Sequence, residues 1–152
     1  MKKANLLNLK NKAVDNFKGG FNCAESTLLA LSDNMNIHCK YIPQISTCFG
    51  AGFGRHGEVC GALTGALMAI GLQHGRKDSK DLNTKEKAYL LADRLLKKFE
   101  KKFGNIRCSL LIDCNLLTPE GQKKAKDENV HKKICSNLVA FTASEAARIL
   151  KL

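Results

Sequence analysis

The chain has no tryptophan and only two prolines, and aromatic residues make up 6% of its 152 residues. It has no apolar run close to the roughly 18 residues that a membrane-spanning helix needs, so we expect no membrane segment. The motifs CxxC, CxxCH, GxSxG, HExxH and the P-loop are also absent. Their absence argues against a zinc ribbon, a thioredoxin-type pair, covalent haem and the common hydrolase and phosphate-binding sites.

Acidic residues are few as well: 14 of them stand against 25 Lys and Arg, which leaves a formal net charge of +11. Such an excess can attract nucleic acid. The lysines cluster over 97–102 and 123–133, on the polar faces of predicted helices, with Glu100, Asp127 and Glu128 among them. No aromatic residues interleave with them as base-stacking platforms would. We therefore interpret the clusters as solvated helix faces and expect no nucleic-acid partner.

The first residues are basic, as in a secretory signal peptide, but the apolar stretch that should follow is interrupted. Asn5, Asn8, Lys10 and Lys12 break it, which indicates a helix and not a signal. We accordingly expect a cytoplasmic location. The length is that of one ordinary domain, covering residues 1–152.

Apolar residues recur at helical spacing throughout, and no sustained alternating run predicts a strand. The sequence therefore predicts an all-α fold, a compact single-domain bundle of about six to seven helices with a glycine-rich loop before the central helix. The main helices are expected over 4–18, 23–31, 58–73, 83–102 and 130–150, with shorter ones near 43–49 and 108–112 and one starting at Thr118-Pro119. Asn22 and Glu25 form a capping-box pattern, and Asn105 is the expected cap of the helix at 108–112.

A glycine-rich loop precedes the central helix. Its segment Gly52–Gly57 fits GxGxxG, but no strand precedes it, so we expect no dinucleotide site. A generic anion site at the helix start is the better interpretation. Within the helix, Gly61 and Gly65 are four residues apart, which leaves one face nearly bare and lets another helix approach closely.

Seven cysteines are present, an odd number that cannot all pair within one chain. In a reducing compartment, several thiols indicate a metal or redox role, although buried cysteine is also an ordinary packing residue. Cys23, Cys60 and Cys108 each lie near the start of a predicted helix, where the helix dipole would lower the thiol pKa and favour thiolate. His131 and Cys135 are four apart on one face and could ligate a metal; His56 lies near Cys60 in sequence.

Several segments together resemble one known family. They are Asn22-Cys23-Ala24-Glu25, the stretch Gly50–Gly75 with its Cys60-Gly61-Ala62-Leu63-Thr64-Gly65, the segment Phe103–Cys108, and Cys135 in the last helix. In these the chain resembles the C_GCAxxG_C_C family, small proteins named for four cysteines and described as redox-active. The resemblance implies that the four are Cys23, Cys60, Cys108 and Cys135, with Cys114 the alternative for the third position. Cys39 and Cys48 are then additional.

Three functions remain open at this point, and the sequence does not decide whether the protein is an enzyme. Four thiolates suit a [2Fe–2S] or [4Fe–4S] cluster or zinc, in a protein that exchanges electrons with an unknown redox partner. Alternatively, Cys60 is the nucleophile of a thiol–disulfide redox protein, with Cys23 or Cys108 as the resolving thiol. In the third interpretation the chain is a non-catalytic binding or assembly module whose glycine face contacts a second copy or a partner. The positions of the four sulfurs in the fold distinguish these functions.

Overall fold

The computed structural model describes residues 3–152, and Met1 and Lys2 of the basic N-terminus lie outside this range. The described residues are helical with no named strand, which confirms the predicted all-α class. In chain order the elements are α1 (Lys3–Lys18), α2 (Cys23–Asn34), the 3-10 helix η1 (Gln44–Phe49), α3 (Gly50–Phe53), α4 (Gly61–His74), α5 (Leu82–Phe103), α6 (Cys108–Ile112), α7 (Pro119–Asp127), the π-helix η2 (His131–Cys135) and α8 (Ser136–Leu150). Among residues 3–152, no helix is both long enough and apolar enough to cross a membrane.

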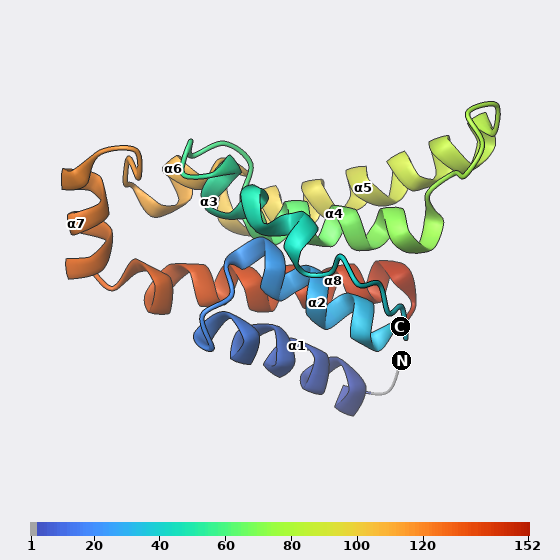
Figure 1. Cartoon of the computed structure of the whole chain (residues 1–152), viewed down its shortest axis with the longest axis horizontal. Helices are drawn as coiled ribbons and strands as arrows, with labels where there is room; N and C mark the ends of the chain where they lie inside the picture. The colour runs from blue at the N-terminus through green and yellow to red at the C-terminus, as the bar shows by residue number, and fades with distance from the viewer. Residues whose placement is uncertain (1–2) are drawn as a thin grey trace.

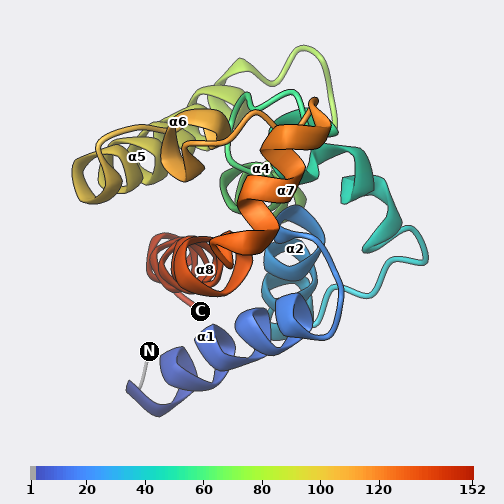
Figure 2. The same ribbon diagram turned by 90° about the vertical axis from the view of Figure 1, so that its left-hand side faces the viewer.

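The last helix, α8, is the centre of the bundle. It contacts α1, α2, α4 and α5, and Figure 2 shows it nearly end-on with these helices around it. Its inner positions include Ala143, Ala146 and Ala147, all fully buried. Small side chains let neighbouring helices approach closely on several sides, so one helix can serve as the common core element.

Close packing of α2 against α4 follows from the bare glycine face that the sequence predicts. A Cβ atom placed on Gly65 would lie 2.3 Å from the carbonyl oxygen of Ala24, so only glycine permits this approach. The two helices therefore meet almost backbone to backbone, and the start of α2 is held close to the start of α4 (Figure 1).

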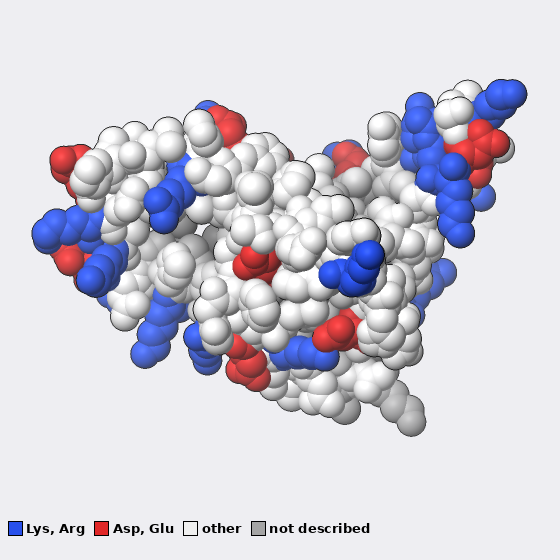
Figure 3. Space-filling model, viewed as in Figure 1, with Lys and Arg blue, Asp and Glu red and all other residues white. Residues whose placement is uncertain are grey.

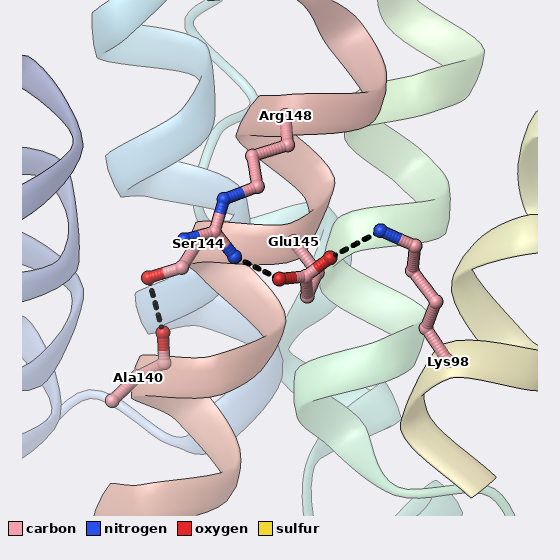
Figure 4. A network of polar contacts seen from close by, with 5 residues as sticks. All are labelled: Lys98, Ala140, Ser144, Glu145 and Arg148. Atoms are coloured by element: carbon pink, nitrogen blue, oxygen red, sulfur yellow. Dashed lines mark hydrogen bonds and ion pairs between the residues drawn. The ribbon is translucent and has the colours of Figure 1, made fainter. Parts of the chain in front are cut away.

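The long helix α5 joins α8 through an apolar and a polar contact. Phe99 packs against Phe103 and Phe141, with ring centroids 4.8 Å and 6.2 Å away. Beside them, the largely buried carboxylate of Glu145 accepts a hydrogen bond from Lys98 at 2.7 Å and pairs with Arg148 (Figure 4). The ion pair ties α5 to α8 at a point where a lone carboxylate would be costly to bury.

The central helix begins later than the sequence predicts. The expected start was Glu58, whereas α4 begins at Gly61 with Cys60 as its N-cap residue. The preceding residues are extended and pair antiparallel with the segment before α6. The backbone N–H of Cys60 donates to the backbone carbonyl of Ile106 at 2.8 Å, and the backbone N–H of Cys108 donates to the backbone carbonyl of Glu58 at 2.6 Å. These amides are satisfied outside a helix, which explains the later start.

Two other helix starts also differ from expectation. The final helix was expected from Val130, but five residues first form the π-helix η2, and α8 begins at Ser136. The N-cap of α6 is Arg107 and not Asn105, whose side chain instead accepts a hydrogen bond from the Arg107 amide at 2.8 Å. By contrast, Thr118 caps α7 as its Thr-Pro pattern predicts.

Helix α7 lies at one end of the molecule, on the left in Figure 1, away from the main bundle. A small second core connects it to the rest, formed by the buried residues Cys108, Ile112, Cys114 and Val130, with Ala125 of α7 packed against them. Lys124 also bridges to Asp113 at 2.7 Å. The α7 segment therefore covers the end of the bundle without belonging to the main core.

Candidate functional site

A cavity of about 560 Å³ lies at the end of the bundle that α7 covers, and residues of α2, α3, α7 and η2 contribute to its lining. In Figure 3 the surface is hollowed between the left-hand lobe, which carries α7, and the centre of the molecule. Four cysteines line this cavity: Cys23, Cys60, Cys108 and Cys135. They come from four different segments of the chain, spread over more than a hundred residues.

Cys23 is the first residue of α2, and its position is set by the predicted capping box. The Asn22 side chain accepts hydrogen bonds from the amides of Ala24 and Glu25 at 2.9 Å and 3.0 Å, while Glu25 accepts one from the Asn22 amide at 2.8 Å. Asn22 also donates to the carbonyl of Thr47 at 3.0 Å. The cap thus fixes the start of α2 and joins it to η1.

Cys60 and Cys108 are brought together by the extended pairing described above, because each lies in one of the two antiparallel segments. The glycine loop passes directly beside them. A Cβ on Gly52 would lie 2.8 Å from the Cβ of Cys108, and Gly52 has a φ of +65°. Glycine is required here both for the backbone conformation and for the close approach.

The glycine-rich loop includes the short segment α3, whose residues Ala51 and Gly52 are not helical, and it makes a left-handed turn next to the cavity. Ala51, Phe53 and Arg55 have φ values of +54°, +63° and +79°. Left-handed backbone costs a non-glycine residue about 1–2 kcal/mol, and runs of this kind concentrate at functional sites. Ala51 and Arg55 both line the cavity, so the turn forms part of its wall.

Cys135 is the last residue of the π-helix η2. His131, at the other end of η2, lines the same cavity and lies against Phe17, with ring centroids 5.3 Å apart. Its side chain is exposed, whereas Cys135 is half-buried. Single π-helical turns are rare and recur at functional sites. The pair that the sequence places on one face therefore reaches one cavity, His131 near the surface and Cys135 deeper.

The remaining candidates lie elsewhere. Cys39 and Cys48 are exposed and do not line the cavity. Cys114 is buried in the small second core beside Cys108 but does not line the cavity either. His56 is exposed and is not among the lining residues. All seven cysteines are free thiols in the described structure.

The expected lowering of the thiol pKa values is wrong. Burial raises the pKa of Cys60 well above its ordinary value, and the neighbouring Cys23 raises it further. Burial likewise raises the pKa of Cys23, and it raises the pKa of Cys108 and of Cys135 to about 12. Hydrogen bonds from the backbone amides of Ala51 and Gly61 lower the pKa of Cys23, but they offset only part of the increase that burial causes. Loss of hydration outweighs the helix amides, because a thiolate in an apolar cavity exchanges many water contacts for few.

This arrangement has a definite chemical consequence. The four thiols stay protonated when nothing compensates their charge, and a bound cation favours the thiolate form. Among the described residues, no group of three or more His, Cys, Asp or Glu side chains is arranged to hold a single metal ion. The four sulfur atoms line a cavity and are not gathered at one point.

We compared the chain with known proteins. No curated protein and no solved structure matches it significantly. A protein-family model described as "Putative redox-active protein (C_GCAxxG_C_C)" matches residues 21–149. The match includes all four cavity cysteines and covers far more than half of the chain. The chain therefore belongs to the C_GCAxxG_C_C family.

Proposed function

We propose that the protein carries electrons by means of an iron–sulfur cluster held by the thiolates of Cys23, Cys60, Cys108 and Cys135. One observation carries the proposal: four cysteines from four separate segments line one cavity. Four cysteine thiolates are the usual donor set of [2Fe–2S] and [4Fe–4S] clusters. When bound, such a cluster takes up and releases an electron.

The distribution of the sulfurs favours a cluster over a single zinc ion. A zinc site gathers four ligands around one atom, at about 2.3 Å for each sulfur. The described residues hold no such gathering, and the thiols instead border a cavity of about 560 Å³. A polynuclear centre binds thiolates at several metal atoms and therefore suits donors that are spread around a space.

Thiol–disulfide exchange with Cys60 as the nucleophile is less well supported. Such a nucleophile needs access and a sizeable thiolate fraction near neutral pH. The Cys60 side chain is only 3% exposed, and burial raises its pKa. Both properties slow attack on an external disulfide. They do not hinder the binding of a cation, which itself supplies the compensating charge.

Anaerobic reconstitution of the full chain with iron and sulfide tests the proposal. We expect a brown protein with about two or about four iron atoms per chain and an equal amount of inorganic sulfide. Replacement of each cavity cysteine by serine, one at a time, should lower iron content sharply and alter the electron paramagnetic resonance spectrum of the reduced protein.

Three other cysteines provide matched controls. Cys39→Ser and Cys48→Ser change exposed thiols outside the cavity, and Cys114→Ser changes a buried thiol outside it. All three should retain the cluster. A colourless, iron-free protein after reconstitution would overturn the proposal, and so would equal iron loss in controls and cavity variants. A protein that contains stoichiometric zinc and no sulfide would overturn the cluster proposal and indicate a zinc site in its place.

A further inference from the structure

The cavity has two chemically different ends. At its buried end lie Cys60 and Cys108. At its open end the lining side chains are exposed and polar, namely Arg55, Gln122, Lys126, Asn129 and His131. The whole cavity, the thiol end included, has a volume of about 560 Å³, within the range of about 300–1,000 Å³ that is typical of small-molecule sites. The cavity therefore has the size and polarity gradient of a ligand pocket.

The open end is positively charged. Arg55 approaches from the glycine loop and Lys126 from α7, and neither forms a salt bridge in the part of the chain that the structure describes. No Asp or Glu lines the cavity, although the chain contains 14 acidic residues. Nearby Asp127 and Asp113 pair with other lysines of α7. In a partly enclosed space, uncompensated cations of this kind attract anions.

Apart from Asn22 and the cysteines, the rest of the wall is apolar. Phe17, lying against His131, forms one side, and Leu116 and Ala125 lie on the side of α7. A ligand that satisfied both features would carry an anionic head at the open end and a compact apolar body further in. Binding sites for small organic molecules commonly combine a mostly apolar wall with a few placed polar groups.

We propose that the cavity binds a small organic oxyanion, a carboxylate or phosphate with an apolar body, whose charge is held by Arg55 and Lys126. The inference goes beyond the iron–sulfur function and does not depend on it, because the two cations and the apolar wall belong to the chain itself. The ligand would lie between solvent and the four thiols.

Calorimetric titration of the reduced, metal-free full chain with three matched probes tests this. The probes are benzoate and phenyl phosphate, which share an aromatic body and differ in the oxyanion, and benzyl alcohol, which carries no charge. We expect saturable binding of at least one anion and much weaker binding of the alcohol. The Arg55→Gln/Lys126→Gln double variant should bind the anion at least about tenfold more weakly, because two charge-assisted contacts are lost.

The control is Lys101→Gln/Lys102→Gln, which removes two charges from an exposed part of α5 away from the cavity and should leave the affinity unchanged. Equal binding of the alcohol, equal weakening by both double variants, or no saturable binding of either anion would overturn the inference. The same titration on the reconstituted protein separates it from the cluster proposal. Loss of iron with retained anion binding refutes only the cluster, and normal iron content without anion binding refutes only the ligand site.

Discussion

The backbone of Gly61 lies directly against the sulfur of Cys23: a Cβ placed on Gly61 would stand 2.4 Å from that Sγ and 3.0 Å from the carbonyl oxygen of Phe49. The glycine that follows Cys60 therefore makes room for the sulfur of Cys23, which lies on a different helix. The close packing of α2 on α4 therefore also brings the Cys23 sulfur next to the start of α4, where Cys60 lies.

Gly61→Ala should destabilise the protein by about 1–3 kcal/mol, because an added methyl group in a filled space forces backbone or side chains to move. It should also lower iron content after reconstitution, since the Cys23 sulfur must shift. Urea unfolding and iron analysis measure the two effects. The matched control is Gly71→Ala in the same helix, where nothing lies within 4 Å of the new methyl group. It should gain about 0.5–1 kcal/mol from helix propensity. Equal effects at both positions would contradict the structural explanation.

Asn22→Ala should lower the free energy of unfolding by about 1 kcal/mol, the usual cost of losing a helix N-cap. It removes the acceptor for two α2 amides and the donor to Thr47. Asn22→Asp keeps the acceptor and should lose less. Because Cys23 follows the cap directly, its alkylation should be faster in Asn22→Ala than in Asn22→Asp. Identical stability and alkylation in the two variants would show that the cap does not position this cysteine.

Iodoacetamide at about pH 8 should modify Cys39 and Cys48 well before the four cavity thiols in the metal-free protein. The first two are exposed, whereas burial raises the pKa of each cavity thiol, and only thiolate reacts. Mass spectrometry of digested samples over time gives the order. Early modification of Cys60 would contradict this prediction and would favour Cys60 as a nucleophile.

The stability of the metal-free protein should fall as the pH rises above 9. The pKa of Cys108 and of Cys135 is raised from 9.0 to about 12 in the folded chain, so the unfolded chain releases these protons first. The contribution of these two thiols to the free energy of unfolding is then constant below the unfolded pKa near 9 and decreases up to about pH 12. Thermal unfolding at several pH values checks this, with Cys108→Ala/Cys135→Ala expected to show a shallower decline. A decline that is equally steep without these two thiols would contradict the assignment.

Glu145→Gln should lower the free energy of unfolding by about 1.5–3 kcal/mol at pH 7, the range for hydrogen bonds that involve charged groups. Burial raises the pKa of Glu145, but the hydrogen bond from Lys98 and the charge of Arg148 outweigh it and hold this pKa below the usual 4.5. The stabilisation is thus present above pH 4.5 and is lost as the pH falls further, so variant and wild type should converge in acid. Asp93→Asn, which removes an exposed pair with Lys97, should change stability by less than about 1 kcal/mol. If the stabilities of the variant and the wild type still differ at low pH, Glu145 is not the ionised group that the structure indicates.

Much of the fold follows from local pattern. The helical periodicity predicted the all-α class, and the α2 capping box and the Thr118 cap of α7 lie where the sequence places them. Local hydrogen bonding explains this success, because a cap depends on residues within one turn. The start of α4 was missed because the amide of Cys60 bonds to Ile106, a partner 46 residues away that no local pattern reveals.

By itself, the sequence determined the helical class, the close-approach face of Gly61 and Gly65, and which four cysteines resemble those of the family. Only the tertiary structure decided that these four line one cavity, that Cys114 does not line it, and that burial raises the pKa of each of the four thiols. The reason is physical: convergence of distant segments and loss of hydration depend on the packing of the whole chain. A thiol at a helix start is acidic only if water or a cation also reaches it.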